Sequence, residues 1–337
     1  MTTDAADPFA PTSDEFSQPD IIIRSSDGVD FFAHKQLLTF TSHFFANMLS
    51  FPAPQGDAAN AMRDGLPVVP LVESSTGIRV LLLMCYPRYS STYNIDALDG
   101  VAEAHAAAAK YDLPAATAHL ESLLADPRSI EKQTYRVYAI ACLCGLEDIA
   151  KAAAREALKL PVIAPSTDFR TAVPEYKILP AHHLWLLDKL RRVCIDAISK
   201  SLAEYRRDRF DDWPDDEGYT SFVWWRNAVD GSELKHAEGC GPRSEEMEPG
   251  GFYKESPARW FHQHIADVAD ATMFSSNVDD VAKRVGDMSQ KTMEAVAKCP
   301  LCLEQAPSEL RRISVYLQAV FHRIRDTELS KTTFTAL

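Results

Sequence analysis

Glycine is scarce in this sequence, and the glycine-based motifs of catalysis and nucleotide binding are missing. The 337 residues include 13 glycines, and none belongs to a Gly-x-Ser-x-Gly elbow or a phosphate-binding loop. The His-Glu-x-x-His pattern of zinc proteases is absent as well. The sequence therefore predicts a protein that is not an enzyme.

Long apolar runs and basic clusters are also missing. No run approaches the roughly 20 apolar residues that cross a bilayer, and the acidic N-terminus lacks the apolar stretch of a signal peptide. The formal net charge of −13 at pH 7 would repel a phosphate backbone. We therefore expect an intracellular protein, cytoplasmic, nuclear or both, that binds neither membranes nor nucleic acid directly.

Cysteine is too sparse for a disulfide framework. The chain has seven cysteines, an odd number, and no Asn-x-Ser/Thr glycosylation site. We expect these thiols to be reduced, as in most intracellular proteins. Metal binding is then an available role for them.

Composition divides the chain into four parts. Residues 1–18 combine Asp, Pro, Ser and Thr with few apolar side chains and predict a disordered leader. Residues 19–125 show short strand patterns followed by helices, residues 126–209 a helical extension, and residues 210–337 a helical C-terminal region that opens with a Gly/Pro/Glu-rich section. The expected fold class is α+β and mostly helical: a small sheet capped by helices, followed by an all-α C-terminal region.

The second of these parts begins with alternating strand and helix signals. The stretch "DIIIRSSDGVDFFAHK" predicts two strands joined by a tight turn at Asp27-Gly28. Apolar residues from Leu37 to Leu49 then recur at the spacing of one helix face. "LPVVPLV" predicts a strand at the edge of the sheet because prolines bound it. "STGIRVLLLMCYP" predicts a helix capped by a serine.

These residues resemble the start of a BTB/POZ domain. That family has an Asp before the first strand, a second strand that ends in a small residue and His-Lys, and a helix with Ser-x-x-Phe. Asp20, Ala33-His34-Lys35, Ser42 and Phe45 occupy these places. "AAAAKYDLPAATAHLESLL" is similar to a later helix of the family, so the resemblance covers roughly residues 19–125. The architecture resembles fungal BTB proteins with a helical C-terminal region.

The resemblance implies a protein-protein interaction module that pairs with itself and recruits partners. Self-pairing would bury an apolar surface, which predicts a homodimer. Phenylalanines and a leucine near the first helix are candidates for that surface, although each could equally be core. An Asp and a Lys match a charged pocket beside the dimer interface, and the alternative for them is an ordinary surface ion pair. The candidate partner-binding residues are Asp20, Lys35, Phe31, Leu37, Phe40 and Phe44.

Two partner classes follow from the same resemblance. Members that bind the cullin scaffold of ubiquitin ligases carry an apolar-x-Glu element and a helix pair after the domain. This chain has "MRD" at Met62–Asp64 and two helical patterns in "QTYRVYAIACLCGLEDIAKAAAREAL". A ubiquitin-ligase adaptor is one hypothesis, and a transcriptional co-regulator that acts through a corepressor is the alternative.

A separate constellation in the C-terminal half suggests a metal site. "HAEGC" contributes His236 and Cys240, and "CPLC" contributes Cys299 and Cys302. Tetrahedral zinc takes four nitrogen or sulfur ligands, so this set predicts one structural zinc ion. Four free, partly buried side chains are the alternative. In a neighbouring helical pattern, His262 or His264 could replace the first histidine, but not both, because they point in different directions.

A catalytic alternative uses the same four residues. If one of them left the metal, a zinc-bound water could attack a substrate, with Glu238 as the base. A zinc-dependent hydrolase is therefore a third hypothesis, alongside the two partner-binding ones.

Overall fold

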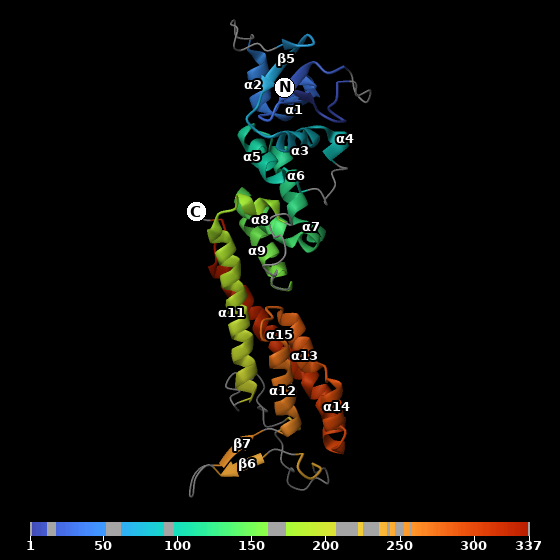
Figure 1. Cartoon of the computed structure of the whole chain (residues 1–337), viewed down its shortest axis with the longest axis vertical. Helices are drawn as coiled ribbons and strands as arrows, with labels where there is room; N and C mark the ends of the chain where they lie inside the picture. The colour runs from blue at the N-terminus through green and yellow to red at the C-terminus, as the bar shows by residue number, and fades with distance from the viewer. Residues whose placement is uncertain are drawn as a thin grey trace. The chain divides into compact units, whose positions relative to one another are not determined.

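The computed structural model describes most of the chain and divides it into two compact units. It describes residues 2–11, 18–51, 62–90, 98–160, 173–206, 222–224, 236–240, 243–246, 253–256 and 258–335. The first unit comprises residues 1–156, 168–183 and 334–337, and the second comprises residues 157–167 and 184–333. The first contains a five-stranded sheet with helices, whereas the second is helical apart from one two-stranded sheet. The predicted α+β, mostly helical class is confirmed (Figure 1).

The sheet of the first unit is built around the predicted hairpin. Strands β2 (Ile21–Arg24) and β3 (Val29–Ala33) pair antiparallel, with Ile22 opposite Phe32. Gly28 completes the turn at a φ of 82°, a conformation that glycine adopts without strain. The strand order is β1-β3-β2-β5-β4.

Strand β5 (Leu66–Pro70) was expected at the edge of the sheet, and this prediction is wrong. It pairs parallel with β2 on one side and antiparallel with β4 (Met62–Arg63) on the other. Because β4 contributes only two residues, opposite Leu66 and Pro67, β5 is an inner strand along a short stretch only. That short overlap explains how a strand with two prolines lies inside a sheet.

The prediction of a disordered leader is wrong for residues 2–11. Strand β1 (Thr3–Asp4) pairs parallel with β3, and the Phe32 N–H donates to the Phe9 carbonyl at 3.0 Å. The Phe9 side chain is 1% exposed and packs edge-on against Tyr86, with ring centroids 5.3 Å apart. One buried ring and a few backbone hydrogen bonds therefore order a segment whose composition predicts disorder.

The helix expected between Leu37 and Leu49 is two helices. α1 (Lys35–Thr41) ends at Ser42, and α2 (His43–Ser50) begins there. The Ser42 hydroxyl accepts from the Phe45 N–H at 3.0 Å and donates to the Tyr111 carbonyl at 2.6 Å. Ser42 has an extended backbone and caps the second helix, which is why a continuous apolar period contains a break.

The first of the remaining helices in this unit lie next to the sheet, and the later ones lie farther from it. α3 begins after the Ser74 cap, as predicted, and lies against α5 (Figure 1). Pro114 separates α5 from α6, and Gly145, in the left-handed conformation, separates α8 from α9. The bounds are α3 (Ser75–Cys85), α4 (Pro87–Ser90), α5 (Val101–Lys110), α6 (Pro114–Ala125), α7 (Pro127–Lys132), α8 (Thr134–Cys144), α9 (Glu147–Ala157), the 3-10 helix η1 (Pro174–Lys177) and the start of α11 (Ala181–Arg206).

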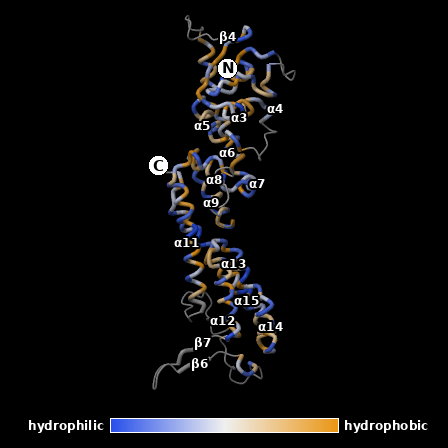
Figure 2. Tube along the Cα trace, in the orientation of Figure 1, coloured by the Kyte–Doolittle hydropathy of each residue, from blue (hydrophilic) through white to orange (hydrophobic). Residues whose placement is uncertain are grey.

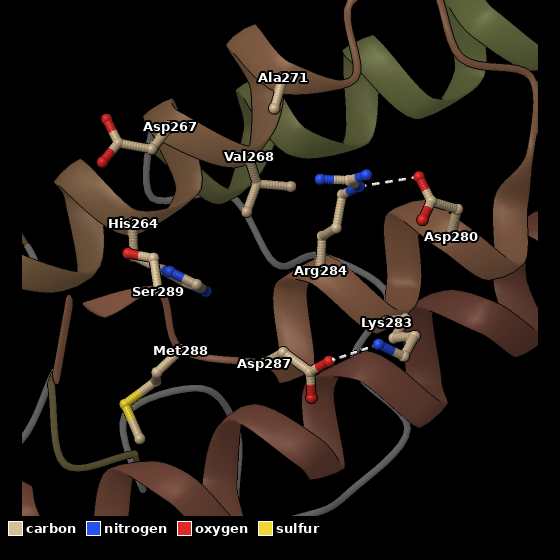
Figure 3. Close-up of a pocket in the computed structure, with 10 residues that line it drawn as sticks. All are labelled: His264, Asp267, Val268, Ala271, Asp280, Lys283, Arg284, Asp287, Met288 and Ser289. Atoms are coloured by element: carbon tan, nitrogen blue, oxygen red, sulfur yellow. Dashed lines mark hydrogen bonds and ion pairs between the residues drawn. The ribbon is translucent and has the colours of Figure 1, made fainter. Parts of the chain in front are cut away.

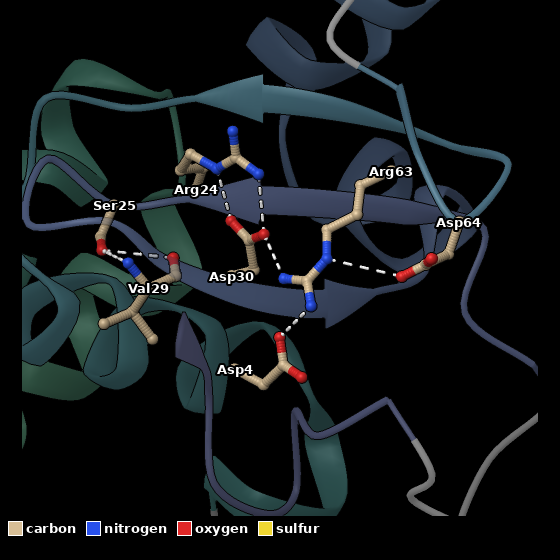
Figure 4. Close-up of polar contacts among 7 residues, drawn as sticks. All are labelled: Asp4, Arg24, Ser25, Val29, Asp30, Arg63 and Asp64. Carbon is tan, nitrogen blue, oxygen red and sulfur yellow. Dashed lines mark hydrogen bonds and ion pairs between the residues drawn. The ribbon is translucent and has the colours of Figure 1, made fainter. Parts of the chain in front are cut away.

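A buried carboxylate connects the strands of this sheet. Asp30 on β3 is fully buried and accepts from Arg24 on β2 at 2.6 and 2.8 Å and from Arg63 on β4 at 2.5 Å (Figure 4). Arg63 also contacts Asp4 on β1 at 2.6 Å. Burial alone would raise the pKa of Asp30, but the two guanidinium groups hold it below its ordinary value. Asp30 is therefore ionised and paired.

The second unit is a helical bundle with an aromatic core. Its elements are β6 (Arg243–Glu246), β7 (Tyr253–Ser256), α12 (Arg259–Ala271), α13 (Val278–Gly286), α14 (Gln290–Val296) and α15 (Pro300–Lys331), together with most of α11. The rings of Phe222, Trp224 and Phe261 stack at centroid distances of 4.9 and 4.4 Å. A Cβ on Gly286 would lie 2.8 Å from Ser314 Cβ, so α13 and α15 pack closely there.

Apolar and hydrophilic residues alternate along the helices of both units (Figure 2). Accordingly, no helix among the described residues is both long and apolar enough to cross a membrane.

We expect Phe9→Ala to destabilise the first unit by about 3–5 kcal/mol, because it removes a fully buried aromatic ring. Phe51→Ala is the matched control, since Phe51 is 73% exposed and its loss should change the free energy of unfolding by less than about 0.5 kcal/mol. Denaturant titration of both variants measures the difference. Equal stabilities would mean that residues 2–11 do not pack on the sheet.

We expect Asp30→Asn to cost roughly 2–4 kcal/mol, because two arginines lose their buried partner while remaining about a quarter exposed to solvent. The low pKa of Asp30 stabilises the fold above the pKa of the unfolded chain, and this stabilisation is lost as the pH falls below about 3.8. Unfolding measured from pH 7 to pH 3 should therefore show a smaller acid-induced loss of stability in the variant. An identical loss in both proteins would contradict this role.

Candidate partner-binding face and candidate metal centre

Helices α1 and α2 carry two exposed phenylalanines. Phe40 is 87% exposed and Phe44 is 41% exposed, while Leu37 is half-buried. The Phe44 ring packs against the rings of Phe45 and Tyr111, with centroids 5.5 and 5.1 Å apart. Leu37, Phe40 and Phe44 form what we call the α1–α2 face, and its exposed aromatic area is available to a partner.

Phe31 does not belong to this face. Its side chain is 2% exposed, and its ring packs 6.1 Å from that of Phe9 within the core of the first unit. It lies on β3, in which every residue from Asp30 to Ala33 is buried. The prediction that Phe31 contacts a partner therefore does not fit its burial, and we remove it from the partner-binding set.

Asp20 and Lys35, predicted to belong to a charged pocket or alternatively to form a surface ion pair, are in contact through the Lys35 backbone. The Asp20 Oδ1 atom accepts from the Lys35 backbone N–H at 2.7 Å, and the Asp20 N–H donates to the Ala33 carbonyl at 3.1 Å. Asp20 thus satisfies a free N–H at the first turn of α1 from the neighbouring strand. This contact fixes where α1 starts and so positions the α1–α2 face.

Tyr86 is a residue of this region that the sequence did not single out. Its hydroxyl lies 3.1 Å from the His34 N–H and 2.9 Å from His34 Nδ1, and its ring is 1% exposed. Burial raises the pKa of Tyr86, so the phenol stays protonated. His34 is therefore a structural residue at the junction of β3 and α1, held by a tyrosine 52 positions away.

The four predicted metal ligands come together in the second unit. His236 and Cys240 lie in a turn in which the Cys240 N–H donates to the Ala237 carbonyl at 3.0 Å. Cys299 is the N-cap residue of α15, and Cys302 lies in its first turn. Gly239 adopts a φ of 74°, which lets the turn direct both of its donors toward the helix end. All four donor atoms lie within 4.8 Å of one another.

The distances within this cluster match a tetrahedral metal site. With zinc bonds of about 2.3 Å to sulfur and 2.0 Å to nitrogen, tetrahedral ligands lie about 3.8 Å apart for two sulfurs and about 3.5 Å for sulfur and nitrogen. Cys240 Sγ and Cys302 Sγ are 3.5 Å apart, and His236 Nδ1 lies 3.4 Å from Cys302 Sγ and 3.6 Å from Cys299 Sγ. The cluster could therefore hold a metal ion.

The charges in the cluster are arranged for a cation. Burial would raise the pKa of Cys299, but the backbone N–H groups of Ala237 and Cys302 and the His236 side chain lower it to about 6. Burial raises the pKa of Cys302 and of Cys240, and the nearby Cys299 thiolate raises both further. A bound cation would remove this penalty, since it stabilises all three thiolates together.

A buried tryptophan lies next to the cluster. Trp260 is 6% exposed, and its indole N–H has no hydrogen-bond partner. The same indole lowers the pKa of Cys302, so the N–H lies close to that sulfur. A metal-bound thiolate accepts hydrogen bonds far better than a neutral thiol does, and it would satisfy this orphaned donor.

The alternative histidines do not join the cluster. His264 is 2% exposed, and its two ring nitrogens lie 3.2 Å from the Thr292 hydroxyl and 2.9 Å from the Val285 carbonyl. Burial lowers its pKa, so it is a neutral core residue. His262 lies on the exposed side of α12 and is not part of the group of metal-ligating atoms.

His264 also borders a cleft of about 380 Å³ between α12 and α13 (Figure 3). Four charged residues that line it are engaged with one another, Arg284 with Asp280 at 2.8 Å and Lys283 with Asp287 at 2.9 Å, and the fifth, Asp267, pairs with Lys291 at 3.1 Å. Because both nitrogens of His264 are occupied as well, these lining residues offer no base beside a nucleophile. The cleft has the character of a surface groove.

The fold of the first unit defines a class of protein: a small interaction module with short strands, capped by helices, and with an exposed aromatic helical face. Residues 11–127 match the family model of the BTB/POZ domain. The chain therefore carries a BTB/POZ domain, a type of domain that mediates protein-protein interactions and is typically not catalytic. A search of curated proteins found no match, and neither did a search of solved structures.

Proposed function

We propose that this protein is a non-catalytic scaffold that forms a homodimer through the α1–α2 face and presents a partner protein to a larger assembly. The observation that carries this proposal is the exposure of Phe40, at 87%, on a helix whose start is fixed by Asp20. Water contacts nearly the whole of this aromatic ring in the single chain. Covering it would provide a driving force for association.

Symmetry doubles that driving force. In a two-fold dimer the same patch is used on both subunits, so two copies of each phenylalanine are buried. Burial of one phenylalanine side chain contributes about 1.5–3 kcal/mol, and Leu37 and Phe44 extend the patch beside Phe40. The two Phe40 rings alone would thus contribute about 3–6 kcal/mol, which offsets part of the free-energy cost of bringing two chains together.

The proposed partners are the cullin scaffold of a ubiquitin ligase or, as the alternative, a corepressor, with action in the cytoplasm, the nucleus or both. Of the "MRD" element, Met62 is 60% exposed and available to a partner. Arg63 is engaged with Asp4 and Asp30, so it supports the sheet. Direct partner contact through this element would therefore use Met62 and the neighbouring Asp64, which is largely exposed.

We further propose that the cysteine-histidine cluster binds one structural zinc ion. All four tetrahedral positions would be filled by His236, Cys240, Cys299 and Cys302, which leaves no position for a reactive water. Glu238 is exposed to solvent on the turn. A closed site of this kind fastens the 236–240 turn to the start of α15, and it argues against the hydrolase hypothesis.

Replacing Phe40 with Asp should raise the dimer dissociation constant by at least about 100-fold, because each dimer loses two buried rings and gains two desolvated charges. Sedimentation equilibrium over a range of protein concentrations measures this constant. Phe274→Asp is the control, since Phe274 is 79% exposed in the second unit and should leave the constant unchanged. A wild-type chain that stays monomeric at high concentration would refute the proposed dimer.

Replacing both Cys299 and Cys302 with Ser should reduce bound zinc from one ion per chain to none. The loss should also lower the melting temperature by roughly 5–10 °C, since metal binding contributes directly to folding. Elemental analysis and calorimetry measure the two effects. Cys144→Ser, outside the cluster, is the control that should keep its zinc. Unchanged zinc content in the double variant would rule the site out.

A further inference from the structure

The end of the chain returns to the first unit and is held there by specific contacts. α15 ends at Lys331, and Phe334 belongs to the first unit. The Phe334 side chain is completely buried, and its ring meets that of Tyr138 edge-on, with centroids 5.7 Å apart. The Tyr138 hydroxyl donates to the His183 carbonyl at 2.7 Å, which fixes the ring that receives Phe334.

A single carboxylate binds the backbone of this segment. Glu147, the first residue of α9, has an Oε2 atom that accepts from the N–H groups of Phe334 and Thr335, both at 3.0 Å, and from the Thr335 hydroxyl at 2.9 Å. Lys151 holds the other oxygen at 3.1 Å. Burial would raise the pKa of Glu147, but these donors keep it below its ordinary value. The receiving group is therefore a preoriented anion.

We propose that Tyr138, Glu147 and His183 form a docking site for a segment that carries a phenylalanine followed by a threonine, and that the chain's own C-terminal residues fill this site. The site recognises one ring, two backbone N–H groups and one hydroxyl. The backbone of Phe334 also hydrogen-bonds the buried His183. None of these contacts requires the bound segment to be part of a helix or a sheet.

The occupant is the segment of the same chain, because Phe334 and Thr335 make these contacts in the single chain. The inference is independent of the α1–α2 face and of the metal cluster, because it uses none of their residues.

The test uses two full-length variants that differ by one position. Glu147→Gln removes the charge that binds the segment, whereas Asp148→Asn removes an exposed charge from the same first turn of α9. Hydrogen exchange of the Phe334 and Thr335 amides should become at least about tenfold faster in the first variant and should not change in the second. Equal exchange rates in the two variants would overturn the proposal.

A peptide experiment tests recognition directly. A fluorescent peptide with the sequence of residues 330–337 should bind the full-length Phe334→Ala variant, whose own segment no longer fills the site. It should bind the wild-type chain at least about tenfold more weakly, and a peptide with Ala in place of the phenylalanine should not bind either chain. Equal binding to both chains, or binding to neither, would contradict the proposal. A dimer that persists in Phe40→Asp and disappears in Phe334→Ala would also overturn it, because the segment would then be exchanged between two chains.

Discussion

The first unit depends on the buried carboxylate of Asp30. It lies on β3 and binds Arg24 on β2 and Arg63 on β4, and Arg63 in turn contacts Asp4 on β1. Four of the five strands are thus connected through one charge, although two of them have only two residues each. Strands so short gain little from pairing alone, so the ionic network and the packing of the first segment are needed to hold them. With the sheet in place, Asp20 can fix the start of α1, and the exposed aromatic face follows from that position.

The second unit uses a different means of holding distant segments together. Its core consists of stacked aromatic rings and of apolar side chains from α12, α13 and α15. Of the 236–240 turn, Ala237 and Cys240 pack against that core, and both are only partly buried. The same turn contributes His236 and Cys240 to the cluster with Cys299 and Cys302, whose donor atoms lie close enough together to hold an ion. A metal ion contributes much binding free energy per residue, and a short polar turn can be ordered by it.

The first unit contains two different kinds of contact surface. The BTB/POZ domain supports a protein-protein interaction module, and helices α1 and α2 of this unit carry exposed aromatic area. The C-terminal segment is held in the same unit by a second kind of contact. The Glu147 carboxylate accepts hydrogen bonds from backbone N–H groups, and the Tyr138 ring packs against Phe334. The first depends on apolar area and the second on directed hydrogen bonds, so the two can operate independently.

Local sequence determined the elements and the nature of both candidate sites. Asp27-Gly28 determined the hairpin, Ser74 determined the start of α3, and Pro114 determined the division between α5 and α6. The spacing of two cysteines determined the core of the metal cluster. Each of these signals acts on residues only a few positions away. Tertiary structure alone decided that Phe9 is buried, that β5 is an inner strand, that Phe31 is core while Phe40 is exposed, and that Glu147 meets Phe334 across 187 positions. These outcomes depend on which surfaces meet after the chain has folded. Periodicity and composition describe one segment at a time and carry no information about that choice.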